Sequence, residues 1–425
     1  MKVFFVSFGC DKNKVDSEKI LKLLFNTVND VELVEFENEA DCIIVNTCAF
    51  IKDAKDESEN YIEYLVNLKK EKNSNLKKIF ILGCLAKEYE ILGKKFSSEI
   101  DLVFPTEKYI DDIDNKYERV SDILSFSSSI KISEGCDKNC SYCIIPKLRG
   151  KFKSREISDI LLEAKELANN GVRELNIVAQ DTLSYGRDLY NEVRIVDLIE
   201  NISIINGIEF IRFLYCYPEE ITNNFIKLIK NNKKVVHYID MPLQHINDKI
   251  LKNMHRATNK EAITKTINNI REEIPDIALR TTFIVGFPGE TEEDFNELCD
   301  FVKEIKFDKL GVFTYSREKL SDSYNYENQI DEDTKNRRRE KLLSIQEDIV
   351  KTINKNRVGN TYKAIVEGFD TNTNSYIVRA YFDARDIDDK IFVKTNKKLI
   401  SGDFIDVKIK KVINYDLDGE LIKIY

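Results

Sequence analysis

Tryptophan is absent from this chain of 425 residues, and glycine and proline are scarce, at 15 and 6 residues. So little glycine and proline excludes a collagen-like chain and a Pro/Gly-rich disordered one. Long apolar runs are also missing, because no segment reaches the length of about 18 residues that crosses a membrane. The apolar N-terminus is too short for a secretory leader. We therefore expect a cytoplasmic protein with no membrane partner.

Histidine is also scarce, and the chain has no excess of positive charge. The three histidines, His237, His245 and His255, lack the spacing of a zinc-protease helix. Glycine-rich loops of the Walker A or GxGxxG type are also missing, which argues against an ordinary nucleotide-phosphate cradle. The 65 basic residues are outnumbered by 74 acidic ones, for a net charge of −9. Bulk positive charge therefore cannot drive nonspecific binding to nucleic acid.

Cysteine, by contrast, is plentiful. The 9 cysteines cannot all pair within one chain, because their number is odd. In a reducing compartment, clustered cysteines bind metal or do chemistry more often than they form disulfides. Cys42, Cys216 and Cys299 fall inside or beside predicted strands and helices, and we interpret them as core or surface thiols. The other cysteines form two groups.

The first part of the chain alternates short apolar runs with amphipathic segments. Strands are predicted at residues 2–8, 42–45 and 79–82, and helices at 16–24 and 54–68. Alternating strands and helices indicate an α/β layer with a mostly parallel sheet. We expect an N-terminal domain over residues 1–115 and a polar linker at 111–129.

A second α/β pattern follows, over residues 122–352. Strands are predicted at 130–133, 175–179, 210–214, 235–239, 279–285 and 310–314, and helices at 157–168 and 291–305 among others. Six such units build a curved parallel sheet, a partial (βα)-barrel, with its active groups at the carboxyl ends of the strands. A charged helix at 331–355 contains the arginine run 337–339, which we interpret as a solvated face.

The tail, residues 355–425, changes to short β-rich runs separated by turn residues. These runs lie at 362–366, 376–380, 390–393, 404–411 and 421–425. They predict a small all-β barrel of about 70 residues. The expected fold class is therefore α/β with an all-β tail.

Cys136, Cys140 and Cys143 form a CxxxCxxC pattern directly after the first strand of the predicted barrel. Three thiolates so close together can wrap one compact metal centre. A structural zinc takes four protein ligands, and no fourth Cys or His has a matching spacing nearby. A [4Fe–4S] cluster on three cysteines keeps one iron open for a substrate or cofactor. The alternatives are a zinc site with a distant ligand and unliganded core cysteines.

This pattern, with an aromatic before its last cysteine, resembles the radical S-adenosylmethionine (SAM) superfamily. The resemblance implies that the three cysteines hold a cluster whose open iron chelates SAM. One-electron reduction then cleaves the sulfonium and releases a 5′-deoxyadenosyl radical. It also implies that Tyr142 packs near the adenine, with ordinary core packing as the alternative.

Cys10, Cys48 and Cys84 are far apart in sequence, but each ends a predicted strand. The ends of parallel strands gather on one edge of a sheet, where ligands bind. The adjacent Gly9 and Gly83 allow the backbone to approach a bulky cofactor closely. These cysteines are therefore candidate ligands of one cofactor, and unrelated buried cysteines are the alternative.

The three domains together resemble the methylthiotransferase family over essentially the whole chain, and the tail resembles its TRAM domain. One branch of that family modifies an adenosine beside the tRNA anticodon, and the other an aspartate of the small-subunit ribosomal protein uS12. The stretches that resemble the second branch are GCDKNKVDSE (9–18), CIIPKLRG (143–150), AQDT (179–182), DMPLQH (240–245), FIVGFPGET (283–291) and YDLDGE (415–420). Phe8 and Ala49 replace the usual Leu and Gly, and neither change removes a ligand.

Further candidates follow from position. Gln180 comes after the second barrel strand and either faces the site or caps its loop. Arg280 lies on a late barrel strand and Gly286 in the loop after it, and both are candidates to contact SAM. The alternative for Gly286 is an ordinary strand-to-helix turn. His245 lies beyond a strand end and is another candidate to line the pocket. We expect no catalytic residue beyond the cluster cysteines.

The resemblance implies the chemistry and the partners. Two [4Fe–4S] clusters and SAM are the expected cofactors: the first cluster starts hydrogen abstraction from the aspartate β-carbon, and the second supplies or carries sulfur. The expected partners are the ribosomal protein, an external electron donor of the flavodoxin or ferredoxin type, and RNA contacted by the TRAM domain. The alternatives are a tRNA adenosine methylthiotransferase and a non-enzymatic iron–sulfur protein that binds RNA.

Overall fold

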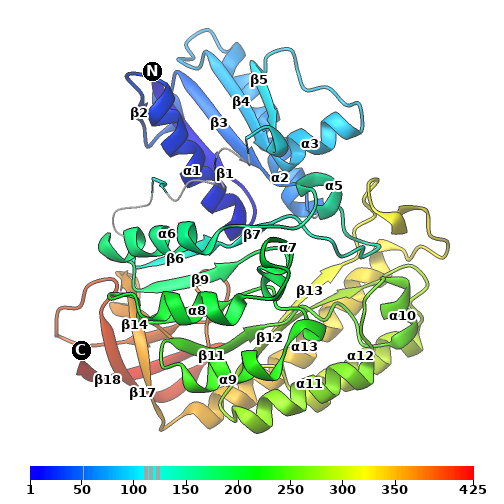
Figure 1. Ribbon diagram of the computed structural model, residues 1–425, viewed down its shortest axis with the longest axis vertical. Helices are drawn as coiled ribbons and strands as arrows, with labels where there is room; N and C mark the ends of the chain where they lie inside the picture. The colour runs from blue at the N-terminus through cyan, green and yellow to red at the C-terminus, as the bar shows by residue number, and fades with distance from the viewer. Residues whose placement is uncertain (51, 110–112, 114–117, 121–124) are drawn as a thin grey trace.

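The computed structural model describes residues 1–50, 52–109, 113, 118–120 and 125–425. Three units follow one another along the chain: an N-terminal α/β unit, a central unit of parallel strands and helices, and a C-terminal β-barrel (Figure 1). The predicted boundary residues 115 and 122 lie outside the described residues. No helix in the described ranges combines the length and the apolar character needed to cross a membrane.

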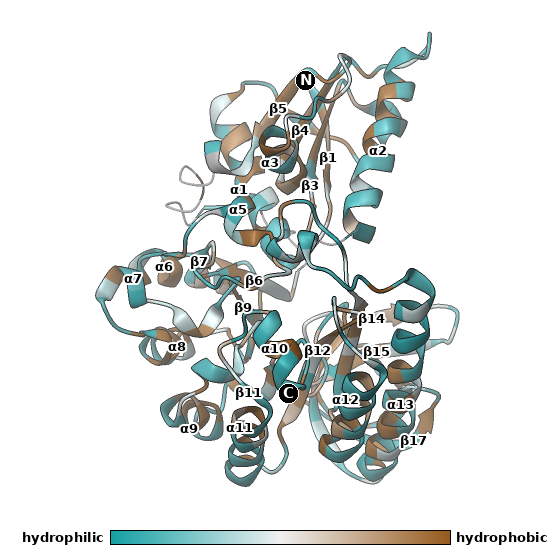
Figure 2. Cartoon of the chain, turned by 90° about the vertical axis from the view of Figure 1, so that its right-hand side faces the viewer, coloured by the Kyte–Doolittle hydropathy of each residue, from teal (hydrophilic) through white to brown (hydrophobic). Residues whose placement is uncertain are grey.

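A five-stranded parallel sheet forms the N-terminal unit, in the order β2-β1-β3-β4-β5. Its strands are β1 (Lys2–Ser7), β2 (Glu32–Leu33), β3 (Cys42–Thr47), β4 (Lys78–Gly83) and β5 (Leu102–Pro105), and its helices are α1 (Asp11–Thr27), α2 (Lys52–Lys70) and α3 (Cys84–Ile91). Every residue of β3 is buried, as expected of a parallel sheet covered on both faces. Figure 2 shows these apolar strands beside helices with polar outer faces. The predicted α/β layer is confirmed, with β2 and β5 as additional strands.

Helix α1 begins at Asp11, earlier than the predicted start at Asp16. The buried positions of its first turn are polar, since Lys12 and Asn13 are both buried. The Asn13 side-chain amide donates to the Phe8 carbonyl at 2.9 Å and to the Thr47 carbonyl at 3.0 Å. A search for apolar periodicity misses such a turn, because tertiary hydrogen bonds rather than apolar side chains hold it against the sheet.

Six parallel strands form the central sheet, in the order β13-β12-β11-β10-β9-β6. They are β6 (Ser127–Lys131), β9 (Glu174–Val178), β10 (Phe210–Phe213), β11 (Val235–Asp240), β12 (Ala278–Val285) and β13 (Lys309–Thr314), with a short antiparallel pair, β7 (Ser133–Glu134) and β8 (Lys153–Ser154). The helices are α5 (Ile145–Arg149), α6 (Ile157–Asn169), α7 (Arg187–Tyr190), α8 (Ile195–Ser203), α9 (Asn223–Asn231), α10 (Asp248–Asn253), α11 (Lys260–Glu273), α12 (Glu292–Ile305) and α13 (Glu332–Arg357). The predicted partial (βα)-barrel is confirmed.

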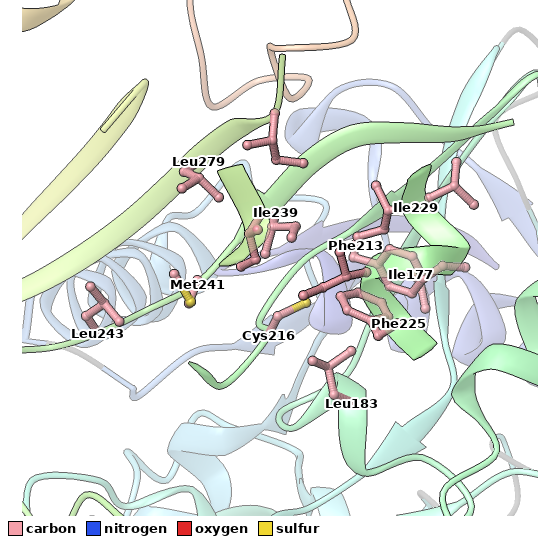
Figure 3. Close-up of a cluster of buried hydrophobic side chains, with 14 of the residues drawn as sticks. Ile177, Leu183, Phe213, Cys216, Phe225, Ile229, Ile239, Met241, Leu243 and Leu279 are labelled. Atoms are coloured by element: carbon pink, nitrogen blue, oxygen red, sulfur yellow. The ribbon is translucent and has the colours of Figure 1, made fainter. Parts of the chain in front are cut away.

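The largest core lies between one face of this sheet and the helices outside it. Figure 3 shows part of it, where Ile177 of β9 and Phe213 of β10 meet Phe225 of α9. Side chains alternate along a strand, so the opposite face carries other residues, including Val236 and Tyr238 of β11. These pack with the C-terminal barrel, which therefore covers part of the sheet that helices leave open.

The predicted linker, 111–129, extends too far. Ser127, Ser128 and Ser129 belong to β6 and pair in register with β9. Their polarity is satisfied within the sheet, since the Ser127 hydroxyl donates to Glu174 Oε2 at 2.8 Å. Much of the remaining predicted linker lies outside the described residues.

A closed five-stranded barrel forms the tail, in the order β14-β15-β16-β18-β17. Its strands are β14 (Thr361–Asp370), β15 (Ser375–Ala380), β16 (Ile391–Val393), β17 (Phe404–Ile413) and β18 (Asp416–Ile424). This confirms the predicted all-β tail. It sits against the starts of the central strands, where the rings of Phe210 and Phe404 meet edge to face at 5.0 Å.

Buried charges link the tail barrel to the central sheet. Glu174, the first residue of β9, accepts hydrogen bonds from Arg379 of β15 at 2.9 Å and from Arg212 of β10 at 3.2 Å. All three side chains are buried. Burial alone raises the pKa of Glu174, but Arg379 and Arg212 outweigh it and lower that pKa to about 2. Glu174 is therefore ionised in the fold, and its charge is balanced across the interface.

Candidate active site

The loop between β7 and α5 carries Cys136, Cys140 and Cys143, beyond the end of the first barrel strand. The Lys138 N–H donates to Cys136 Sγ at 3.4 Å, and the Ile145 N–H to Cys143 Sγ at 3.5 Å. Burial raises the pKa of Cys136 to about 11 and that of Cys143 to about 12. Such thiols hold their protons until a metal displaces them. The backbone N–H groups that point at the sulfurs then stabilise the negative charge of the resulting thiolates.

Aromatic side chains surround this loop. Tyr142 packs against a small buried cluster that includes Met254 and Phe287, and burial and the neighbouring Cys140 raise its pKa well above the usual value. Tyr217 follows β10, and the Arg256 guanidinium lies 4.4 Å from the centre of its ring. Burial and Cys140 raise its pKa, and the Nζ of Lys138, a residue of the loop, lies 5.2 Å from its ring centre. The sequence pattern did not identify Tyr217.

The strand order of the N-terminal sheet brings Cys10, Cys48 and Cys84 to one edge, because β1, β3 and β4 are neighbours. Gly9 shows how close they come: a Cβ there would lie 2.8 Å from Cys48 Sγ, and its φ of +92° also favours glycine. Burial, followed by Cys84 and Cys10, raises the pKa of Cys48 to about 12. Cys48 and Cys84 are buried, whereas Cys10 is exposed. These three cysteines are called the N-terminal triad below, and Cys136, Cys140 and Cys143 the loop triad.

The donor chemistry of both triads fits an iron–sulfur cluster. All the cysteines of the chain are free thiols. Among the described residues, no three His, Cys, Asp or Glu side chains form a group that could hold a single metal ion. A [4Fe–4S] cube offers a separate iron to each thiolate, so its ligands stand further apart than those of one ion. The three bystander cysteines, Cys42, Cys216 and Cys299, are buried core residues.

Arg149, the last residue of α5, links the N-terminal triad to the unit that carries the loop triad. Its Nε donates to Cys84 Sγ at 3.2 Å, and its Nη1 lies 2.7 Å from Asp16 Oδ2 and 3.5 Å from Glu134 Oε2. Lys131 contacts the same two carboxylates, at 2.5 Å and 2.7 Å. All five side chains are buried, so this network fixes the N-terminal triad relative to the loop that carries the other one. Arg149 stands in the CIIPKLRG stretch, but neither spacing nor residue type revealed its role.

Gln180 and Arg280 lie in different surroundings. The Gln180 amide donates to Glu134 Oε1 at 2.7 Å, which joins Gln180 to the network between the triads. Arg280 lies in the first half of β12, where its Nη1 contacts Asp240 Oδ1 at 2.8 Å and its Nε is 3.9 Å from Asp388 of the tail barrel. Gln180 is therefore placed at the strand ends, whereas Arg280 lies between the central sheet and the tail.

Gly286 begins a tight turn after β12. Its N–H donates to the Glu290 carboxylate, its φ is +76°, and a Cβ there would overlap the Lys335 side chain. His245 is fully buried beside this turn, with its Nε2 3.8 Å from Glu290 Oε1. The arginine run is only partly solvated: Arg338 is buried and donates to the Glu290 carbonyl at 3.2 Å. The interpretation of the whole run as a solvated face was therefore wrong, because one position in each helical turn faces the core.

A lysine and a tyrosine meet where the N-terminal unit contacts the central unit. Lys12, near the start of α1, places its Nζ 3.4 Å from the ring centre of Tyr215. Tyr215 follows β10 and has a φ of +62°, which is uncommon for a residue with a side chain. The sequence pattern identified neither residue, although Lys12 belongs to the quoted GCDKNKVDSE stretch and Tyr215 shares the strand-end position of the cysteines.

Comparison with known families covers all three units. The family model described as "Uncharacterized protein family UPF0004" matches residues 2–105, the radical SAM superfamily matches residues 130–302, and the TRAM domain matches residues 358–422. Among solved structures, the radical SAM methyltransferase TsrM of Kitasatospora setae, with cobalamin and a [4Fe-4S] cluster bound, aligns with a TM-score of 0.53. It is 14% identical, over 74% of each chain, and this likeness shows the fold.

Relatives match the chain over nearly its full length. The protein named ribosomal protein uS12 methylthiotransferase RimO in Clostridium novyi is 46% identical, covering 98% of this chain and 97% of the relative. Proteins of the same name are 44% identical in Clostridium acetobutylicum, covering 99% and 98%, and 43% identical in Clostridioides difficile, covering 99% of both chains. The predicted resemblance is confirmed, and the chain belongs to the RimO family of radical SAM methylthiotransferases.

Proposed function

We propose that this chain adds a methylthio group to the β-carbon of an aspartate in ribosomal protein uS12. The observation that carries the proposal is the arrangement of the two cysteine triads, which lie at the strand ends of two adjoining sheets. Arg149 links Cys84 of the N-terminal triad to Glu134, which precedes the loop with the other triad. The relatives' printed name supplies the substrate. The net change replaces one C–H bond of the substrate by a C–S–CH₃ group.

Two [4Fe–4S] clusters are proposed, one on the loop triad and one on the N-terminal triad. When bound, a cluster on the loop triad together with SAM supplies a 5′-deoxyadenosyl radical for hydrogen abstraction. Tyr142, Gln180 and Gly286 are the residues proposed to contact SAM. Arg280 is not carried into this set, because Asp240 and Asp388 hold its guanidinium between the central sheet and the tail. The buried network of Arg149, Lys131, Asp16 and Glu134 keeps the two triads in a fixed relation, which a reaction between two centres requires.

The remaining expectations about setting and partners are proposals as well. The reductant is an external electron donor of the flavodoxin or ferredoxin type, the TRAM barrel contacts RNA, and the protein works in the cytoplasm beside the ribosome. The domain limits are 1–115, 122–352 and 355–425.

Mass spectrometry of the substrate tests the proposed function. The anaerobically reconstituted protein should be incubated with SAM, sulfide and a reductant in two separate reactions. One reaction contains small ribosomal subunits, and the other contains tRNA. We expect uS12 to gain the mass of one CH₂S unit and the tRNA to remain unchanged. Modified tRNA with unmodified uS12 would reassign the chain to the adenosine branch, and 5′-deoxyadenosine without either product would leave the enzyme class intact and the target wrong.

Replacing Arg149 with leucine should lower the reduction potential of the N-terminal cluster by roughly tens of millivolts, because a cationic donor to a ligand sulfur stabilises the more negative, reduced state. Redox titration followed by electron paramagnetic resonance measures this potential. Lys147→Leu on the same helix is the matched control, since the Lys147 side chain is half exposed and contacts Asp322 instead. Equal potentials in the Arg149 variant and the control would contradict the role assigned to Arg149.

A further inference from the structure

Lys12 differs from every other buried cation in the described chain. Each other buried lysine or arginine has a carboxylate oxygen within 3.6 Å. Lys12 is only 8% exposed, and among the described residues no carboxylate pairs with it. A buried ammonium without an ion-pair partner is costly. Burial lowers the pKa of Lys12, but Tyr215, Cys10, Asp11 and Glu134 outweigh it and raise that pKa. Neither of these two described carboxylates lies within ion-pair distance of its Nζ.

The position of this ammonium is held from both domains. Its stem comes from the first turn of α1, two residues after Cys10, and its Nζ lies over the Tyr215 ring of the central unit. A ring face attracts a cation but does not neutralise its charge. Tyr215 is itself fixed, because its N–H donates to Asp240 Oδ2 at 3.1 Å. The left-handed backbone of Tyr215 is strain of the kind that gathers at functional sites.

The same short segment reaches the other triad. Tyr215 packs against Lys12, whereas the ring centre of Tyr217, two residues on, lies 5.2 Å from the Nζ of Lys138, which belongs to the loop that carries the loop triad. Tyr215 and Tyr217 are both only partly buried, and Cys10 is exposed. The unpaired ammonium therefore sits beside the N-terminal triad, against the segment that follows β10, and the exposed Cys10 lies two residues away in the chain.

We propose that Lys12 binds the side-chain carboxylate of the substrate aspartate, an inference that rests on the proposed function. The carboxyl carbon of aspartate is bonded directly to the β-carbon that reacts. An ion pair at Lys12 therefore holds the reacting carbon one bond away from the bound carboxyl group, on the side of the N-terminal triad. It also selects aspartate over asparagine, since a neutral amide leaves the buried ammonium without its counter-ion.

Peptide binding and turnover test the role of Lys12. The probes are a uS12 peptide with the target aspartate and the same peptide with asparagine in its place, titrated into anaerobically reconstituted full-length protein. We expect the wild type to bind the aspartate peptide roughly a hundredfold more tightly. Lys12→Met should remove this preference, raise KM for the aspartate peptide by a similar factor and release 5′-deoxyadenosine without matching product. Lys14→Met is the matched control, because Lys14 lies in the same turn of α1 but is exposed.

Iron content and cluster spectra separate this role from a structural one. Both should be unchanged in Lys12→Met, and loss of the N-terminal cluster in that variant would show that Lys12 serves the cluster and overturn the proposal. A preference for aspartate that survives in Lys12→Met would overturn it too. If the wild type shows a Lys12-dependent preference in binding but transfers no methylthio group, the proposed function fails while the carboxylate site stands.

Discussion

Alanine at Cys136 should abolish the release of 5′-deoxyadenosine from SAM, by at least about a thousandfold. The loop triad is three sulfurs on one short loop, and the removal of one leaves a cluster with too few ligands to be held with an open iron. Iron content should fall from about eight atoms per chain to about four, two cubes to one. High-performance liquid chromatography of the SAM products and colorimetric iron analysis provide the two measurements.

The N-terminal triad should give the complementary result. Cys48→Ala should also lose about four irons but still form 5′-deoxyadenosine, and no methylthio product should appear. Cys299→Ala is the control, because Cys299 is a buried bystander in α12. Only four irons bound in the wild type would refute the two-cluster model, and 5′-deoxyadenosine from a folded Cys136→Ala protein would refute the assignment of the loop triad.

Replacing Glu174 with glutamine should reduce the free energy of unfolding by about 3–5 kcal/mol, because the change leaves buried Arg212 without a carboxylate and Arg379 with Glu367 alone. Arg379 and Arg212 come from different units, so the tail barrel should also detach more readily from the central sheet. Urea unfolding followed by circular dichroism measures the first effect, and faster proteolysis of the tail measures the second.

A matched control lies at the same interface. Glu209 and Lys363 form a pair at 3.0 Å whose side chains are 40% and 39% exposed, and Glu209→Gln should cost no more than about 1 kcal/mol. A Glu174 variant as stable as this control would contradict the importance of the buried network.

Acid should remove the contribution of Glu174 in a defined range. The fold lowers the pKa of this carboxyl from 4.5 to about 2, so ionised Glu174 stabilises the folded state fully above the higher value. Its contribution is lost as the pH falls from 4.5 towards 2. The stability difference between the wild type and Glu174→Gln should therefore be constant near neutral pH and shrink within this range.

Local patterns determined most of the fold. The apolar runs of the central unit predicted the strands of the partial barrel, because a buried parallel strand needs a continuous apolar stretch. The CxxxCxxC spacing identified the loop triad, since a short loop can present three sulfurs without help from the rest of the chain. The N-terminal triad required a further step, from separate sequence positions to a shared strand-end position, and the strand order of the sheet confirms that step.

The sequence pattern did not reveal the roles of polar residues whose roles depend on tertiary contacts. Lys12 and Asn13 conceal the true start of α1, and Ser127 resembles a linker while it belongs to a strand. No spacing rule connects Arg149 to Cys84 or Lys12 to Tyr215, because each pair comes from different units.

The sequence alone therefore determined the class of chemistry, through its cysteines, and the succession of three domains, through its periodicity. Only the tertiary structure decided how the triads are joined and which buried charge is left without a partner. The physical reason is that apolar burial and short-loop ligation are local, whereas the balance of buried charges is settled between residues more than a hundred positions apart, as for Arg149 and Asp16.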